Sequence, residues 1–219
     1  MIFSHSSLAL FETCPKQFEH TYIIKDIPRV ETEATIWGTK VHEELENYAL
    51  SNTPVVNEGI CSQGVEIIDA VKSDYKEIFC EWEFGLDAEY NIVDFKSPAA
   101  FVRGIVDFGA VNDDKAFLAD WKTGKQKDDF KQMEIFTLAA FAKYPQVQKV
   151  KAAYIWLKFK TVSPQVFTRD DIPMIKAHLM ERVVPAQEHI DAGNFPMKTS
   201  GLCRGWCPVK SCPAYKEPK

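Results

Sequence analysis

Two neighbouring strand-like segments most constrain what this chain can fold into. Phe101–Val111 and Lys115–Trp121 are largely apolar and of strand length, and Asn112-Asp113-Asp114 joins them. A short polar connection between two such segments indicates a β-hairpin. Each segment contains one aspartate in its apolar run, Asp107 in the first and Asp120 in the second. Antiparallel pairing across this turn therefore brings two carboxylates onto adjacent strands.

The remaining chain alternates between helical and extended patterns. Apolar residues recur at helical spacing in Thr39–Leu50 and Val65–Phe79, which precede the hairpin. The other expected elements are a strand at Cys80–Asp87, a helix at Asp128–Lys143, strands at Lys149–Lys160 and Pro164–Thr168, and a helix at Asp170–Asp191. This order predicts an α/β fold in which helices flank a mixed central sheet, built as a single domain over residues 1–219.

The charge distribution excludes one class of nucleic-acid-binding protein. The formal net charge is -5 and the pI about 5.6, so the chain does not coat nucleic acid through a uniformly basic surface. The segments differ strongly, however. Residues 43–94 contain thirteen acids and two lysines, whereas residues 143–169 contain six basic residues and no acid. We therefore expect any contact with a polyanion to be local, with a solvated lysine face as the alternative explanation.

The amino-terminal segment carries no pattern of a secretory signal. No apolar run follows a basic start, and no segment of the chain approaches the length of a membrane span. We expect a cytoplasmic protein, in the host cytoplasm if a phage encodes it, with no membrane partner.

The second strand of the hairpin carries residues suited to phosphodiester hydrolysis. Asp120 and Lys122 are two positions apart, so they project from the same face of the strand while Trp121 faces the other way. Carboxylates bind hard cations such as Mg²⁺ and Mn²⁺, and a nearby lysine can orient a water molecule or stabilise developing negative charge. An Asp-x-Lys triplet alone is also common as an incidental ion pair on a solvated hairpin.

The hairpin resembles the signature of the PD-(D/E)XK nuclease superfamily, in which an aspartate precedes a distant Asp-x-Lys. Further motifs are similar to those of its RecB-like exonuclease branch, which includes iron–sulfur nucleases of CRISPR adaptation and of phage and bacterial recombination. These motifs are Gly38-Thr39-Lys40-Val41-His42, Gln132 on the helix after the hairpin, Cys14-Pro15-Lys16-Gln17-Phe18, and the terminal cysteines Cys203, Cys207 and Cys212. The resemblance implies a restriction-endonuclease-like core.

The resemblance also implies roles for individual residues. Asp107, Asp120, the backbone carbonyl of Trp121 and His42 would hold Mn²⁺ or Mg²⁺, and an imidazole ligand favours Mn²⁺. Lys122 would be the catalytic lysine, and Gln132 would position that lysine or the substrate. Together the implied catalytic residues are Asp107, Asp120, Lys122 and Gln132.

Two positions on neighbouring elements extend this interpretation. Phe136 stands where the branch's Gln-x-x-x-Tyr motif has a tyrosine, so the hydroxyl group is absent. Glu83, on the strand before the hairpin, is a candidate supporting carboxylate, and a solvent-facing acid is an equal alternative.

The cysteines are unevenly placed. Cys203, Cys207 and Cys212 crowd the carboxyl-terminal segment, which in a reducing compartment suggests a metal. With Cys14, the resemblance implies a [4Fe-4S] cluster held by four thiolates, with tetrahedral Zn²⁺ as the alternative and free thiols on a loose tail as the third possibility. A metal here would join residues 1–20 and 195–219 into a cysteine clasp.

These features predict a metal-dependent DNA nuclease, with exonuclease action on single-stranded DNA or DNA ends favoured. A flap or structure-specific endonuclease is the first alternative, and a catalytically silent DNA-binding or assembly subunit is the second. The chain has no phosphate-loop motif of a helicase, so unwinding would need a helicase or recombination partner. Lysines of the basic stretch are the expected DNA contacts, namely Lys149, Lys151, Lys158 and Lys160.

Overall fold

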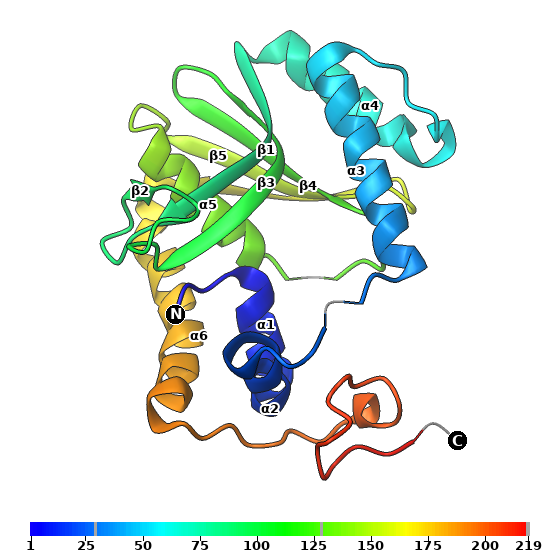
Figure 1. The fold of residues 1–219 in the computed structure, drawn as a ribbon. Helices are drawn as coiled ribbons and strands as arrows, with labels where there is room; N and C mark the ends of the chain where they lie inside the picture. Colours follow the sequence, from blue (N-terminus) through cyan, green and yellow to red (C-terminus); the bar gives the residue numbers. More distant parts are fainter. Residues whose placement is uncertain (29, 128, 218–219) are drawn as a thin grey trace. The chain divides into compact units, whose positions relative to one another are not determined.

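The structure is a computed structural model that describes residues 1–28, 30–127 and 129–217 (Figure 1). The chain forms two compact units. The first comprises Met1–Ile2 and Glu31–Ile175, and the second comprises Phe3–Val30 and Lys176–Lys219. Within the described residues, no helix is long and apolar enough to cross a membrane.

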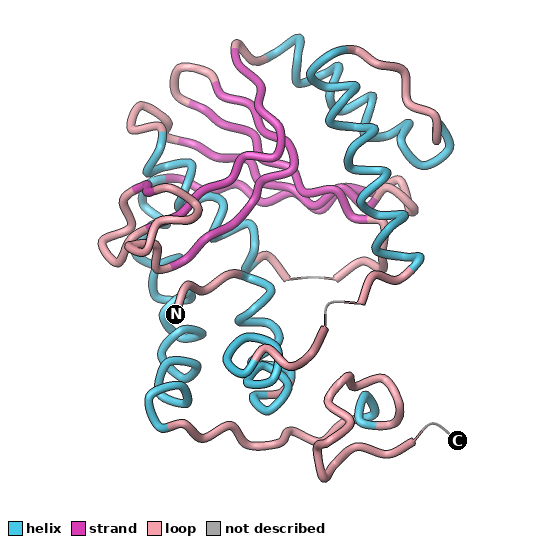
Figure 2. The backbone as a smooth tube through the Cα atoms, in the orientation of Figure 1, coloured by secondary structure: helices cyan, strands magenta, loops and turns pink. Residues whose placement is uncertain are grey.

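The first unit is built on one six-stranded sheet with the order β2-β1-β3-β4-β5-β6. Figure 2 shows the strands in magenta. All neighbouring strands are antiparallel except β4 and β5, which are parallel because a helix, α5 (Lys131–Lys143), connects them. The strands are β1 (Glu77–Leu86), β2 (Ile92–Val93), β3 (Val102–Val111), β4 (Lys115–Lys122), β5 (Lys149–Trp156) and β6 (Thr161–Thr168). The expected α/β fold with a mixed sheet is therefore confirmed.

Helices α3 (Glu33–Ser51) and α4 (Glu58–Asp74) cover one face of this sheet. The helix α3 begins with a capping box between Thr32 and Thr35, which satisfies backbone N–H groups of its first turn. Its buried stripe packs with α4 and with alternate residues of β3, β4 and β5 into one apolar core, whose members include Val41, Leu45, Ile68, Phe108, Phe117, Trp121 and Ile155.

The helix α5 packs against the opposite face. Phe136 of α5 meets Phe84 of β1 edge to face, with their ring centroids 5.9 Å apart. Gly104 makes room for this contact, because a Cβ atom there would lie 2.7 Å from the Phe84 ring. Successive side chains of β4 thus point alternately towards α3 and α4 on one face and towards α5 on the other, as expected of a strand.

The second unit is helical and rich in loops. Its elements are α1 (His5–Thr13), α2 (Pro15–Phe18), the π-helix η1 (Glu19–Ile24), most of α6 (Ile172–Ala192) and the 3-10 helix η3 (Gly201–Cys203). Phe18 is fully buried and contacts Phe11 and Phe195. Arg182 is also buried and pairs with Glu12 at 2.6 Å, so the charge of this guanidinium is compensated.

Some element boundaries differ from those expected. The helix α4 ends at Asp74 and β1 begins at Glu77, whereas the sequence pattern continued the helix to Phe79. Tyr75 and Ile78 fit either period, so apolar spacing did not mark this transition. The helix at Asp128–Lys143 begins at Lys131, and Asp128 lies outside the described residues.

Candidate active site and cysteine cluster

The two aspartates of the hairpin lie where its strands separate. The pairing of β3 with β4 runs from Val111↔Ala116 to Phe108↔Ala119 and ends there. Asp107 and Asp120 are the next residues on the two strands. Because the ladder stops, their backbone and side-chain groups at this fork are available to other partners.

Asp107 joins β4 to α3 across the fork. The backbone N–H of Trp121 donates to Asp107 Oδ2 at 2.8 Å, and His42 Nδ1 lies 3.5 Å from the same oxygen. His42 Nε2 contacts the Trp121 carbonyl oxygen at 2.8 Å, and since a carbonyl can only accept, Nε2 must donate. In neutral His42, Nδ1 therefore presents a lone pair to a carboxylate. This arrangement favours a proton or a cation between the two groups.

Glu81 of β1 completes this group, although the sequence reasoning did not single it out. Ligand atoms of His42, Glu81 and Asp107 all lie within 4.8 Å of one another. Glu81 has a φ of 45°, in the left-handed region that non-glycine residues rarely adopt. Strained backbone of this kind is concentrated at functional sites. The carboxylate that lies close to His42 and Asp107 is thus Glu81, whereas Glu83 of the same strand does not belong to this group.

A second set of contacts surrounds Asp120 on the α5 side. Gln132 Nε2 donates to Asp120 Oδ1 at 2.7 Å, while Lys122 Nζ donates to Gln132 Oε1 at 3.2 Å. Lys122 Nζ also lies 2.5 Å from Asp120 Oδ2. Gln132 therefore fixes both the acid and the lysine of the Asp-x-Lys triplet. Phe136, one turn along α5, is buried in the core and has no polar role in this network.

The electrostatics of the site suit a divalent cation. Burial, followed by the charge of Asp120, raises the pKa of Asp107 well above its usual value, and Glu81 adds to this shift. Burial also raises the pKa of Glu81 and lowers that of His42. Asp120 Oδ2 is buried, and its close contact among the described residues is the ion pair with the Lys122 ammonium. A cation would relieve the repulsion between these carboxylates, so the donor set fits Mn²⁺ or Mg²⁺.

The four lysines expected to contact DNA fall into two groups. Lys149 and Lys151 lie at the start of β5, where Lys149 pairs with Lys115 at the far end of β4. Lys158 and Lys160 follow β5, beyond the residue that pairs with Lys122. All four are exposed. Only the second pair lies at the end of the parallel strands that carries the Asp-x-Lys triplet.

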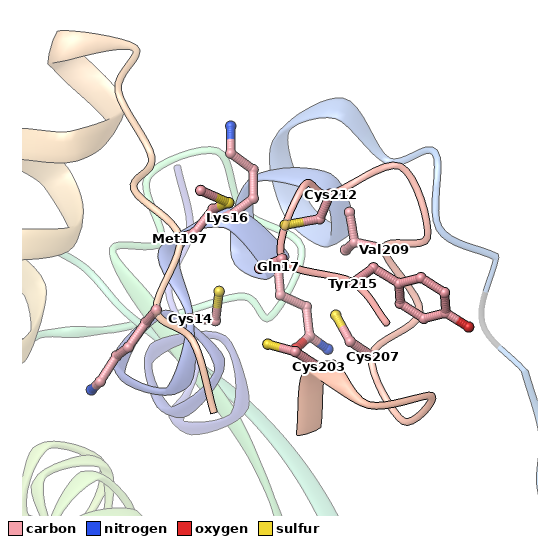
Figure 3. A pocket seen from close by; sticks show the side chains of 11 residues that line it. Cys14, Lys16, Gln17, Met197, Cys203, Cys207, Val209, Cys212 and Tyr215 are labelled. Atoms are coloured by element: carbon pink, nitrogen blue, oxygen red, sulfur yellow. The ribbon is translucent and has the colours of Figure 1, made fainter. Parts of the chain in front are cut away.

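Four of the six cysteines lie around one small cavity in the second unit. Cys14, Cys203, Cys207 and Cys212 line a space of about 20 Å³, and Figure 3 shows their sulfur atoms arranged around it. Burial raises the pKa of Cys207, and the other three thiols contribute to this shift. The remaining two, Cys61 and Cys80, belong to the first unit, where burial raises the pKa of Cys61 to about 11.

Zinc and an iron–sulfur cluster make different demands on the spacing of these sulfurs. Tetrahedral Zn²⁺ with Zn–S bonds of about 2.3 Å needs its thiolates roughly 3.8 Å apart. Among the described residues, no three of the four cysteine sulfurs lie within 4.8 Å of one another. An iron–sulfur cluster places several metal atoms between its thiolates and so takes a wider arrangement. The four thiols are thus donors of the right type for either metal, but among the described residues they are not drawn together at the spacing of a tetrahedral zinc site.

The comparisons with known proteins agree with this fold. The profile of the PD-(D/E)XK nuclease superfamily matches residues 2–213, and the chain therefore belongs to this superfamily, whose members are typically metal-dependent nucleases. Among solved structures, the chain is similar in fold to the one titled "Crystal structure of SSO0001", with a TM-score of 0.50 and 15% identity over 98% of this chain and 87% of that chain. A search of curated proteins found no match.

Proposed function

We propose that this protein is a metal-dependent deoxyribonuclease of the RecB-like branch that degrades DNA from its ends. The observation that carries the proposal is the meeting of His42, Glu81, Asp107, Asp120 and Lys122 at the fork between β3 and β4. Three carboxylates and an imidazole form a site for a hard or borderline cation, and the lysine supplies a positive charge beside it. This combination suits hydrolysis of a phosphodiester.

In this proposal each residue has a defined task. His42, Asp107, Asp120 and the Trp121 carbonyl hold Mn²⁺ or Mg²⁺, and Glu81 adds a further carboxylate to the ligand set. When bound, the cation supplies a Lewis acid that neutralises phosphate charge and lowers the pKa of water. The N–H group of Trp121 orients Asp107 through their 2.8 Å hydrogen bond, so the ligand is held before a cation arrives.

Lys122 and Gln132 act on the reacting groups. The Lys122 ammonium orients the attacking water and stabilises the negative charge that develops on the phosphoryl oxygens. Gln132 is a positioning residue, since its amide contacts both Asp120 and Lys122. Substrate in the site would compete with Asp120 for the Lys122 ammonium, which would shift this lysine from its ion pair to the phosphate.

We further propose that Cys14, Cys203, Cys207 and Cys212 hold a [4Fe-4S] cluster, with Zn²⁺ as the alternative. The support for this proposal is that all four cysteines line one cavity. Bound there, it would clasp residues 1–20 to residues 195–219. The short helices α2 and η3 bring Cys14 and Cys203 to the cavity, and the metal would hold loops that have few other buried groups.

The mode of cleavage is tested with substrates that differ only in their ends. In Mn²⁺, we expect rapid release of nucleotides from linear single-stranded DNA and no cleavage of the same sequence as a covalently closed circle. Linear DNA with both ends blocked is the control, because it lacks free ends without being circular. Nicking of the circle at the rate of linear cleavage would instead establish an endonuclease, and inertness towards every substrate would favour a DNA-binding subunit.

A further inference from the structure

The loop that carries the terminal cysteines also forms a groove that the nuclease site does not use. This groove has a volume of about 390 Å³ and is lined by Thr199, Ser200, Cys203, Arg204, Ala214 and Lys216. Two chain segments form it side by side. The N–H group of Lys216 donates to the Cys203 carbonyl at 2.8 Å, and Arg204 pairs with Lys216 in a parallel β-bridge. Backbone contacts thus fix the two cationic residues as neighbours.

The charges around the groove suit an anion. Its lining contains two cations and two hydroxyl groups and no carboxylate. Among the described residues, neither Arg204 nor Lys216 makes an ion pair with an acid. Like charges placed opposite each other in a β-bridge repel, and a bound phosphate would turn this repulsion into attraction. Arginine can bind a phosphate through two hydrogen bonds, and serine or threonine can add a third.

An exposed tryptophan, Trp206, is close in sequence to the residues that line this groove. Trp206 is 82% exposed, and it follows Arg204 after a single glycine, Gly205, whose φ of 82° turns the chain. A tryptophan is rarely left this accessible, because its ring gains from burial. Leu202 on the same loop is 50% exposed. Two large apolar side chains are therefore exposed on the loop that also carries Arg204.

We propose that this groove and Trp206 form a binding site for single-stranded DNA, with a backbone phosphate between Arg204 and Lys216 and a base stacked on the indole. Single-stranded DNA combines regularly spaced phosphates with accessible base faces, whereas a duplex buries its base faces in the stack. The inference extends the proposed nuclease function by adding a contact for the strand outside the catalytic residues. It requires nothing of Lys122 or of the carboxylates.

Binding is measured with the full chain by fluorescence anisotropy of a labelled thymidine 20-mer, without Mg²⁺ or Mn²⁺ so that no cleavage occurs. We expect Trp206→Ala to weaken binding about tenfold and Trp206→Phe to retain most of it, as base stacking predicts. The double variant Arg204→Gln/Lys216→Gln should lower the slope of log K against log salt by about 0.7, since each phosphate neutralised on a single strand contributes roughly that amount.

Lys210→Gln is the matched control, because Lys210 is an exposed cation of the same loop that does not line the groove. It should bind with a wild-type salt slope. The inference would be overturned if all variants bound the 20-mer as the wild type does, or if Lys210→Gln changed binding as much as the double variant. It would also be overturned if the groove variants lost only binding to vesicles of anionic lipid.

A second readout separates this inference from the proposed nuclease function. Hydrolysis of thymidine 5′-p-nitrophenyl phosphate in Mn²⁺ involves a single nucleotide, so the groove variants should match the wild type. If the wild type cleaves this ester and the groove variants bind DNA as the wild type does, the proposed DNA-binding groove is contradicted and the nuclease function is not. If the wild type cleaves neither the ester nor DNA and the groove variants bind DNA more weakly, the nuclease function is contradicted and the DNA-binding groove is not.

Discussion

Replacing Lys122 with methionine is expected to lower Mn²⁺-dependent cleavage of linear DNA by on the order of 10³-fold. Methionine keeps much of the side-chain length but removes the ammonium group that lies 2.5 Å from Asp120 and bonds to Gln132. The loss should appear in kcat, because the charge it stabilises develops during the reaction. Mn²⁺ binding should persist, since the lysine contributes no ligand.

Lys125→Met provides the control for this substitution. Lys125 is an exposed cation three residues further along the chain, so its loss changes the net charge equally without touching the fork. This variant should retain cleavage within a few fold of the wild type. Equal activity of Lys122→Met and Lys125→Met would remove Lys122 from the mechanism.

Replacing Cys207 with serine is expected to have the largest effect on stability. Cys207 lines the cysteine cavity and its pKa responds to the other three thiols, so its loss would leave three thiolate ligands. Metal binding in such a loop-rich unit contributes directly to its folding. We expect lost absorption at about 400 nm after anaerobic purification, less than one cluster equivalent of iron, and an early melting transition of the second unit.

Cys80→Ala is the matched cysteine control, because Cys80 packs against the core of the first unit and does not line the four-cysteine cavity. It should retain the absorption and the iron content of the wild type. One equivalent of zinc without colour would select the Zn²⁺ alternative. A wild-type protein that is colourless, metal-free and fully folded would contradict both metal assignments.

Local pattern and spacing predicted much of the sheet. The strands β3 and β4 are close to their expected limits, because a polar turn bounds them and their apolar runs are continuous. The same pattern indicated that Asp120 and Lys122 share a face, and their side chains do meet in the structure. The helix α1 was not expected. Its buried residues are few and its capping box uses two serines, Ser4 and Ser7, rather than a serine and a glutamate.

Glu81 illustrates what periodicity could not predict. In a regular strand, side chains alternate between faces, so Phe79 and Glu81 would point the same way. Phe79 instead contacts Trp82 with ring centroids 5.5 Å apart, while Glu81 approaches His42. The left-handed φ at Glu81 breaks the alternation. Only tertiary structure reveals a backbone conformation of this kind, since no glycine or turn residue marks it.

The distribution of the basic residues also depends on topology. The lysines of residues 149–160 are close in sequence, but they lie at opposite ends of β5, whose first residue pairs with Lys115 and whose last residue pairs with Lys122. Counting charges along the sequence therefore treats as one group two pairs of lysines that lie at different ends of the strand. The direction of β5 relative to β4 follows from the crossover through α5, and this connection decides which lysines accompany Lys122.

The central claim, a cation site at the fork of β3 and β4, is tested most directly by Mn²⁺ titration followed by electron paramagnetic resonance. The wild type should bind Mn²⁺ and release nucleotides from linear DNA in proportion to its occupancy. Asp107→Asn should weaken Mn²⁺ binding at least about 100-fold, because even residues that only support a ligand contribute roughly 10- to 100-fold. Equal Mn²⁺ binding by the wild type and Asp107→Asn would contradict the site.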